Sequence, residues 1–141
     1  MGRLINHQVD MVAHFALYSN PNMGGWGLLA RSKPRPSYYV YQLYQQFGEE
    51  LLAAESAVPN LNIYAARRDD GAITVMVINL SDEAQTAPLV LSGNEGDTAV
   101  MTLFDAENLA TDMGSDLFAS HTYPAQSMTL LVVGGGGVRC M

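Results

Sequence analysis

Several features that would narrow the function of this sequence at once are scarce or missing. Cys140 is the only cysteine among 141 residues, so no disulfide can form within the chain. No apolar run approaches the roughly 20 residues that a membrane-spanning helix needs. The first residues contain His7, Asp10 and His14 where a secretory signal would have an unbroken apolar core. The sequence therefore indicates no membrane partner and leaves the localisation open.

Positive charge is also scarce. Seven basic residues face 14 acidic ones, a formal net charge of −7, which argues against binding to nucleic acid or to an anionic membrane surface. This balance is compatible with neutral polar ligands such as sugars. Charged residues make up only 15% of the chain, which suggests that part of its surface is normally covered.

Motifs for metals and cofactors are absent as well. The histidines, His7, His14 and His121, are too scattered for a metal-binding motif. The acidic turn at 93–97 lacks the spacing of a calcium loop, and no phosphate-binding loop follows a strand. We expect neither a metal nor a cofactor.

The apolar content, 48%, is that of a globular chain. Residues 11–17, MVAHFAL, predict a strand buried on both faces, although periodicity does not exclude a helix. Two loops rich in Asn, Pro and Gly follow. An amphipathic helix is then predicted over residues 37–53, capped by Ser37 and buried over most of its circumference, unless Gly48 ends it early.

From Leu61 onward the pattern is typical of β-structure. Residues 61–81 predict two strands joined at Asp69, Asp70 and Gly71, where the Asp-Gly pair favours a tight hairpin. Further strands are expected at 87–93, 98–104 and 127–133, with a turn at 93–97 and a polar excursion at 105–120. These segments predict a mainly β fold, an antiparallel sandwich or open barrel of about five to eight strands.

Two side-chain roles follow from the strand pattern. Asn79 ends a strand, where its amide can satisfy backbone groups as the chain turns away. In the last strand, alternation predicts that Ser127 and Thr129 point outward while Met128, Leu130 and Val132 point inward.

These elements suggest three parts. Residues 1–53 form a strand, loop and helix, 54–133 an antiparallel β module, and 134–141 a flexible tail rich in glycine. A buried strand followed by an amphipathic helix is one repeat of a (β/α)8 barrel, and one repeat cannot bury its own core.

Three stretches in this order carry a resemblance to a known family: GLL…KPRPSYYVYQLYQQFG, then NLNIYAARRDDGAITVMVINLS, then YPAQSMTLLVV. Residues 11–133 resemble the C-terminal end of clan A glycoside hydrolases, such as xylosidases, arabinofuranosidases and endoglucanases. The resemblance implies that 1–53 is a remnant of the catalytic barrel. It also implies that 54–133 is the accessory β-sandwich, whose last strand returns to pair beside the first ones.

The resemblance also bears on catalysis. The two catalytic carboxylates of these enzymes follow the fourth and seventh barrel strands, so both would lie upstream of Met1. The acidic residues present sit in turns or at element ends and are expected on the solvated surface, for example Glu49, Asp69 and Asp70. No catalytic residue is therefore predicted.

Trp26 is the one candidate site residue. Clan A enzymes often carry an aromatic platform for a sugar after the eighth strand, and Trp26 stands at about that place. The alternative is that Trp26 is an anchor in a core or an interface. The tyrosines of the predicted helix could form a sugar-binding strip, but their spacing favours core packing.

Three functions remain open. The chain is a non-catalytic accessory fragment of a glycoside hydrolase, inactive alone, or a free-standing carbohydrate-binding module that uses Trp26 on an oligosaccharide or polysaccharide. The third is a structural protein that self-associates through its N-terminal strand and helix, whose apolar surface would otherwise stay exposed.

Overall fold

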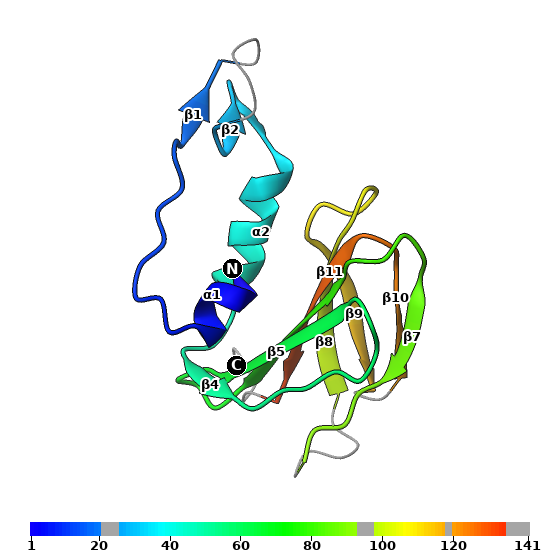
Figure 1. Ribbon diagram of the computed structural model, residues 1–141. Helices are drawn as coiled ribbons and strands as arrows, with labels where there is room; N and C mark the ends of the chain where they lie inside the picture. The colour runs from blue at the N-terminus through cyan, green and yellow to red at the C-terminus, as the bar shows by residue number, and fades with distance from the viewer. Residues whose placement is uncertain (21–25, 93–97, 118–119, 135–141) are drawn as a thin grey trace, which may run out of the picture. The chain divides into compact units, whose positions relative to one another are not determined.

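The computed structural model describes residues 1–20, 26–92, 98–117 and 120–134 (Figure 1). The chain forms two compact units, Met1–Tyr41 and Gln42–Met141, which we describe separately. The predicted turn at 93–97 and all but the first residue of the predicted tail lie outside the described residues. The predicted boundary after residue 53 concerns the origin of the two parts, and it stays a prediction.

The first unit contains short elements. They are α1 (Gly2–Asn6), β1 (Tyr18–Ser19), β2 (Leu29–Ala30), β3 (Lys33–Pro34) and the start of α2 (Pro36–Tyr44). β1 pairs with β2 in parallel, and β2 pairs with β3 in the antiparallel direction. The predicted strand at 11–17 is wrong: the strand formed is β1 at Tyr18–Ser19, and within 11–17 only Ala16 O and Leu17 O accept backbone hydrogen bonds from the segment of β2. Apolar composition favours a strand but does not supply the neighbouring backbone that a strand needs.

The helix is shorter than predicted. α2 begins at Pro36, as suits a residue with no N–H to donate, and ends at Tyr44 rather than near residue 53. Of its residues only Leu43 is buried, so the expected burial of most of its circumference is also wrong. Tighter turns continue the chain, with N–H donation from Gln46 to Leu43 and from Phe47 to Tyr44. The alternative, an early end near Gly48, is the one observed.

Gly48 explains why the helix stops there. A Cβ on this residue would lie 2.5 Å from the backbone carbonyl of Arg67. The Gly48 N–H donates to Thr74 Oγ1 at 2.9 Å, and Glu49 N–H donates to Arg67 O at 3.1 Å. The chain is thereby drawn onto a neighbouring strand, where residues predicted as helical form β4 (Glu50–Leu52).

The second unit contains a six-stranded antiparallel sheet of order β4-β5-β6-β11-β8-β9 (Figure 1). After β4 its strands are β5 (Leu61–Arg67), β6 (Ile73–Asn79), β8 (Thr98–Phe104), β9 (Thr111–Leu117) and β11 (Ser127–Val133). A two-stranded sheet pairs β7 (Gln85–Pro88) with β10 (Ser120–Tyr123). The prediction was a mainly β fold, an antiparallel sandwich or open barrel; the mainly β fold is confirmed, with open antiparallel sheets.

The last strand pairs beside the early ones, as the family resemblance implied. β11 lies between β6 and β8, in register with both. The predicted polar excursion at 105–120 is wrong in its second half, which forms β9 and the start of β10. β9 contains Gly114 at φ +84°, and its pairing with β8 shifts register between Val100 and Thr102. Such a bulge breaks the alternation from which a strand is predicted.

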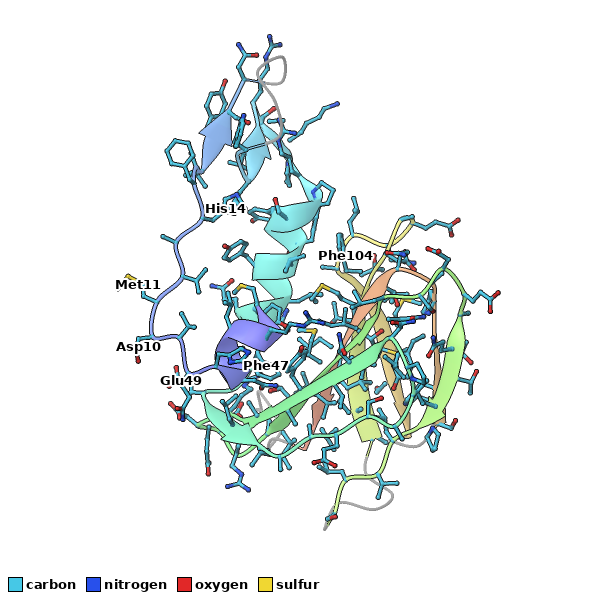
Figure 2. The ribbon with its side chains drawn as sticks, viewed as in Figure 1. Asp10, Met11, His14, Phe47, Glu49 and Phe104 are labelled. Atoms are coloured by element: carbon cyan, nitrogen blue, oxygen red, sulfur yellow. The ribbon has the colours of Figure 1, made fainter. Side chains whose placement is uncertain are left out.

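Apolar clusters cover both faces of the six-stranded sheet. In β6, Val75 and Val77 belong to one cluster and Met76 to the other, because successive side chains of a strand point to opposite faces. The first cluster is closed by residues of β7 and β10 and the second by the segment around Leu43 and Phe47. Phe47 and Phe104 both pack at the second cluster (Figure 2).

This double coverage overturns the predicted alternation of β11. Ser127 and Thr129 are buried rather than exposed, at 3% and 1% of their surface. The Ser127 hydroxyl donates to Pro124 O at 2.7 Å, which satisfies it inside the fold. The error arose because alternation predicts a half-buried strand, whereas β11 is central and covered on both sides.

Asn79 has the role expected of it. Its Oδ1 accepts hydrogen bonds from the N–H and the hydroxyl of Ser81, at 3.0 and 2.7 Å. Its Nδ2 lies 2.9 Å from Glu83 O, 3.1 Å from Tyr123 O and 2.9 Å from Pro124 O. One buried amide therefore ties the end of β6 to the turn that joins β10 to β11.

Candidate functional site

Trp26 lies on the surface of the first unit, with 66% of its side chain area exposed. The interpretation of Trp26 as a core residue is therefore wrong, while its roles as a platform or as an interface anchor stay predictions. Its carbonyl oxygen lies 2.9 Å from His14 Nε2, so this histidine nitrogen carries the proton and donates. The His14 ring packs edge-on against Tyr41, with centroids 5.7 Å apart.

Close backbone packing requires a glycine at the position after Trp26. A Cβ on Gly27 would lie 2.7 Å from Ser19 N and 2.8 Å from Tyr18 C, so only glycine lets the two segments approach this closely. The Ser19 hydroxyl accepts hydrogen bonds from Gly27 N–H and from Arg35 Nη2, each at 3.3 Å. These contacts hold the start of the segment 26–30 against β1.

Two further aromatic side chains join Trp26 around one hollow. A hollow of about 460 Å³ is lined by Phe15, Ala16, Tyr18, Ser19, Asn20 and Trp26. Phe15 is 83% exposed and Tyr18 is 57% exposed. Planar rings that stay open to solvent around a concave surface offer the faces on which a sugar ring stacks. We call Phe15, Tyr18 and Trp26 the aromatic site.

Phe15 and Tyr18 were missed in the sequence. Phe15 lies in the segment that was predicted to be a buried strand. Tyr18 lies in a predicted loop, and nothing in the sequence around it suggested a binding role. Their spacing of three residues, directly before the loop that contains the only tryptophan, is the pattern that could have identified them. Among the residues that the structure describes, no strand covers this apolar run, and its Met11 is 84% exposed. Figure 2 shows Met11 on this run.

The tyrosines of α2 do not form a flat strip. Tyr38 and Tyr39 meet edge to face with centroids 5.6 Å apart, and Tyr44 meets Phe47 in the same way at 5.8 Å. Tyr44 and Phe47 pack against the second apolar cluster of the β unit. Perpendicular rings stabilise one another but present no continuous face to a sugar, so packing explains these residues best.

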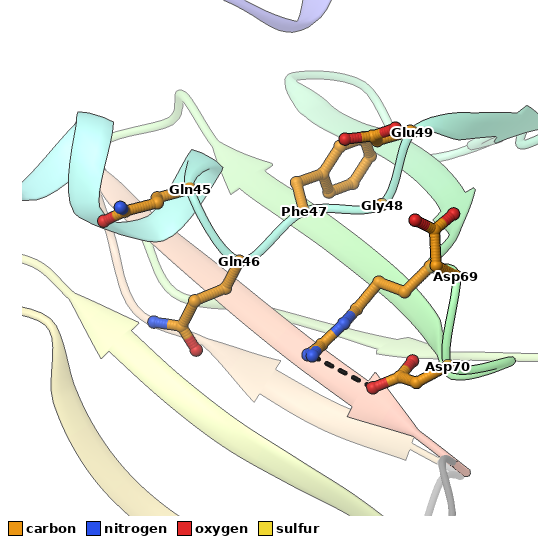
Figure 3. A pocket seen from close by; sticks show the side chains of 8 residues that line it. Gln45, Gln46, Phe47, Gly48, Glu49, Asp69 and Asp70 are labelled. Atoms are coloured by element: carbon orange, nitrogen blue, oxygen red, sulfur yellow. Dashed lines mark ion pairs between the residues drawn. The ribbon is translucent and has the colours of Figure 1, made fainter.

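A second hollow, of about 380 Å³, is lined by acidic residues of the second unit, which we also call the β unit (Figure 3). Its lining includes Glu49, Asp69 and Asp70 together with Arg68 and two glutamines. Asp70 is already used twice: Oδ2 lies 3.0 Å from Arg68 Nη2, and Oδ1 accepts the N–H of Ala72 at 3.0 Å. It serves as a turn residue, as the sequence predicted.

Other carboxylates also stabilise loops or strand pairs. Burial raises the pKa of Asp105, but hydrogen bonds from Glu107 N–H, Asn108 N–H and the Asn108 side chain outweigh it, so the pKa lies below its ordinary value. A general acid needs the opposite shift. Glu50 pairs with Arg67 across two strands at 3.2 Å, with both side chains largely exposed.

The described residues also bear on metals and membranes. Nowhere in the described ranges do three or more His, Cys, Asp or Glu side chains gather where they could hold a metal ion. No helix among the described residues is long and apolar enough to cross a membrane.

No known family profile and no curated protein match this chain. Solved structures do. A bifunctional glucanase-xylanase from a metagenome library is 29% identical, with a TM-score of 0.65 over 74% of this chain. A family 30 xylanase from Clostridium acetobutylicum gives a TM-score of 0.70 at 14% identity over 78% of it. A family 30 endoxylanase from Clostridium papyrosolvens gives 0.63 at 18% identity over 77%.

The chain resembles the glycoside hydrolases. The structures just named are all of this class, which confirms the resemblance that the sequence motifs indicated. The match covers only 24%, 31% and 30% of those three proteins, in the order given. At 14% and 18% identity, the two family 30 matches establish a shared fold alone.

Proposed function

We propose that this chain is an accessory, non-catalytic part of a glycoside hydrolase, which supports the catalytic barrel and does not cleave glycosides by itself. The observation that carries this proposal is the sheet of the second unit, which is covered on both faces and leaves its described carboxylates on turns and edges. The likeness to the 29% identical glucanase-xylanase supports the choice of enzyme class.

The chemistry of hydrolysis supports the non-catalytic role. Glycosidases need two carboxyl groups facing one another across the bond, about 5 Å apart in retaining enzymes and about 6.5–9.5 Å apart in inverting ones. Asp70 and Glu50 are bound to arginines, and Asp105 is held in its own loop. Glu49 and Asp69 line the acidic hollow and are the pair to test.

The test is hydrolysis of aryl xylosides and aryl glucosides by the purified chain. We expect the purified chain to show no more turnover than the double variant Glu49→Gln, Asp69→Asn, prepared in the same way. Turnover that disappears in this double variant would overturn the proposal, because it would place a carboxylate pair in the acidic hollow.

We further propose that the aromatic site binds an oligosaccharide or polysaccharide chain. Three rings that remain exposed around one hollow favour this over packing alone. Because Trp26 is the only tryptophan, the intrinsic fluorescence of the protein reports directly on this site. Titration with xylo- and gluco-oligosaccharides should give a saturable change in that fluorescence.

Variants separate stacking from unspecific effects. Phe15→Ala and Tyr18→Ala should each weaken binding about fivefold, since one aromatic contact contributes about 1 kcal/mol. Tyr38→Ala, an aromatic residue that does not line the hollow, is the matched control and should leave the affinity unchanged. Flat titrations with both sugar series would remove the proposal.

Self-association through the N-terminal segment is the remaining proposal. Met11, Phe15 and Leu17 are 84%, 83% and 65% exposed, and exposed apolar groups of this size favour contact with another apolar surface. Light scattering should show an average mass that rises with concentration in the parent protein and less so in a Met11→Ser, Leu17→Ser variant. A constant monomer mass would contradict it.

A further inference from the structure

The two units of the chain carry formal charges of opposite sign. Met1–Tyr41 contains four basic residues and one acidic residue, so its formal charge is +3. Gln42–Met141 contains three basic and 13 acidic residues, so its formal charge is −10, and the two values give the −7 of the whole chain. Two first units therefore repel one another, as do two second units, whereas a first unit attracts the second unit of another copy.

The free positive charge of the first unit lies on the β2–β3 hairpin. Ala30 pairs with Lys33, so Arg31 and Ser32 form the turn between the two strands. Arg31 and Lys33 are exposed, and neither forms an ion pair with a described residue. The tip of the hairpin thus presents two cations that the described part of the chain does not neutralise.

The exposed apolar run lies beside this hairpin. Leu28 N–H donates to Ala16 O at 3.1 Å and Leu29 N–H donates to Leu17 O at 2.9 Å, so the end of the run is joined to the segment of β2. Leu17 is 65% exposed. Apolar contact provides affinity without selecting a partner, whereas charges select the partner and its orientation. The first unit therefore combines both kinds of contact on one small sheet.

The acidic hollow, lined by Glu49, Asp69 and Asp70, is the matching surface on the second unit (Figure 3). Asp70 is paired with Arg68, but Glu49 and Asp69 are exposed and form no ion pair with a described residue. Leu51, two residues after Glu49, is 48% exposed on the edge strand β4. The hollow thus offers two free carboxylates, with an exposed apolar side chain nearby in the sequence.

We propose that the β2–β3 hairpin of one copy docks at the acidic hollow of a second copy, with Arg31 and Lys33 facing Glu49 and Asp69. The inference rests on the self-association proposed above and names the surface that receives the first unit. A contact between two different surfaces is heterologous, so a dimer keeps one free hairpin and one free hollow. Association should therefore continue beyond the dimer unless a ring closes.

The sign of the salt dependence tests this arrangement. Light scattering gives the average mass of the full chain over a concentration series at about 20 mM and about 500 mM sodium chloride, between which the Debye length falls from about 20 Å to about 4 Å. The mass should fall at the higher salt, because the attraction between hairpin and hollow is screened. Contact between two first units, both positive, should instead strengthen, because their repulsion is screened.

Charge-reversal variants locate the contact. Glu49→Lys, Asp69→Lys should weaken association at least about tenfold, because two attractions become two repulsions. Glu83→Lys, Glu107→Lys is the matched control, since it makes the same change in net charge at two exposed positions outside the hollow. At about 100 mM salt, where distant surface charges are largely screened, the control should stay within about threefold of the parent.

A mixture of two variants tests the pairing itself. Arg31→Glu, Lys33→Glu should lose association when measured alone, because its hairpin repels the hollow. In a mixture with Glu49→Lys, Asp69→Lys, its acidic hairpin meets a basic hollow, and the average mass should rise above that of either variant alone. Recovery in the mixture would also show that both variants are folded.

Three results would overturn the inference while leaving self-association in place. They are a mass that rises with salt, charge reversals at the hollow that act no more strongly than the control, and no recovery in a mixture of variants that keep the circular dichroism of the parent. A monomer mass at every concentration and salt would remove self-association itself, and this inference with it.

Discussion

The two units of this chain differ in how much of their apolar surface they bury. The second unit has strands of up to seven residues, and side chains such as Leu130 and Leu131 are fully buried on its two sheet faces. The first unit has strands of two residues, and large side chains such as Met11 and Phe15 face solvent. Because apolar burial provides most folding free energy, stability should be concentrated in the second unit.

The largest expected effect is on amide hydrogen exchange. Backbone N–H groups in the centres of β6 and β11 should exchange only by global unfolding, and those of β1 and β2 by local opening. Protection should differ at least about a thousandfold, because global unfolding of a small domain costs about 5–15 kcal/mol. Equal protection measured by NMR would show that the chain unfolds as one cooperative unit and would end the contrast.

The next effect compares two leucines. Leu130 is fully buried between β6 and β8, and Leu130→Ala should lower the free energy of unfolding by about 2–5 kcal/mol. Leu17 is 65% exposed, and Leu17→Ala should change it by less than about 0.5 kcal/mol. Urea unfolding followed by far-UV circular dichroism measures both. A large loss for Leu17→Ala would mean that the first unit contributes to the cooperative core.

A smaller effect compares two crowded glycines. A Cβ at Gly48 would meet the Arg67 backbone at 2.5 Å, and one at Gly27 would meet the Ser19 backbone at 2.7 Å. Gly48→Ala should destabilise the β unit by about 1–3 kcal/mol, as forced overpacking does. Gly27→Ala should alter the fluorescence of the neighbouring Trp26 and leave the circular dichroism transition in place. The reverse pattern would contradict the assignment of stability to the second unit.

The smallest effect is the pH dependence due to Asp105. Its folded pKa lies below the ordinary value of 3.8, so its contribution to stability is fully present above that pH and is lost as the pH falls through the folded pKa. The difference in unfolding free energy between the parent and Asp105→Asn should therefore shrink between neutral pH and about pH 2. Glu107→Gln, a charge change in the same loop, is the control. A constant difference would show that the carboxylate charge does not stabilise this loop.

The sequence predicted those strands whose own residues favour β-structure and missed those that depend on pairing with distant strands. β8 and β11 are β-rich runs and have the predicted bounds. β5 and β6 flank the predicted Asp-Gly turn and lie within the predicted span 61–81. β9 and β10 are polar and are strands because other strands pair with them. The same dependence on a partner explains the failure at 11–17, where apolar residues found no pairing of strand length.

The sequence identified one residue of the aromatic site and missed the other two. Trp26 was singled out as the only tryptophan of the chain, in a loop whose position suggested a platform. Phe15 and Tyr18 joined it because the parallel pairing of β1 with β2 brings the segment before β1 beside Gly27.

The sequence alone determined the acidic, weakly charged character of the chain, its mainly β second part, its turn at Gly71 and the capping role of Asn79. These features rest on residue chemistry or on contacts between near neighbours in the chain. Tertiary structure alone decided the end of α2, the burial of Ser127 and Thr129, the strands β9 and β10, and the hollow lined by Trp26. Each of these features depends on contacts with segments distant in the sequence, so the local residue pattern alone does not predict it.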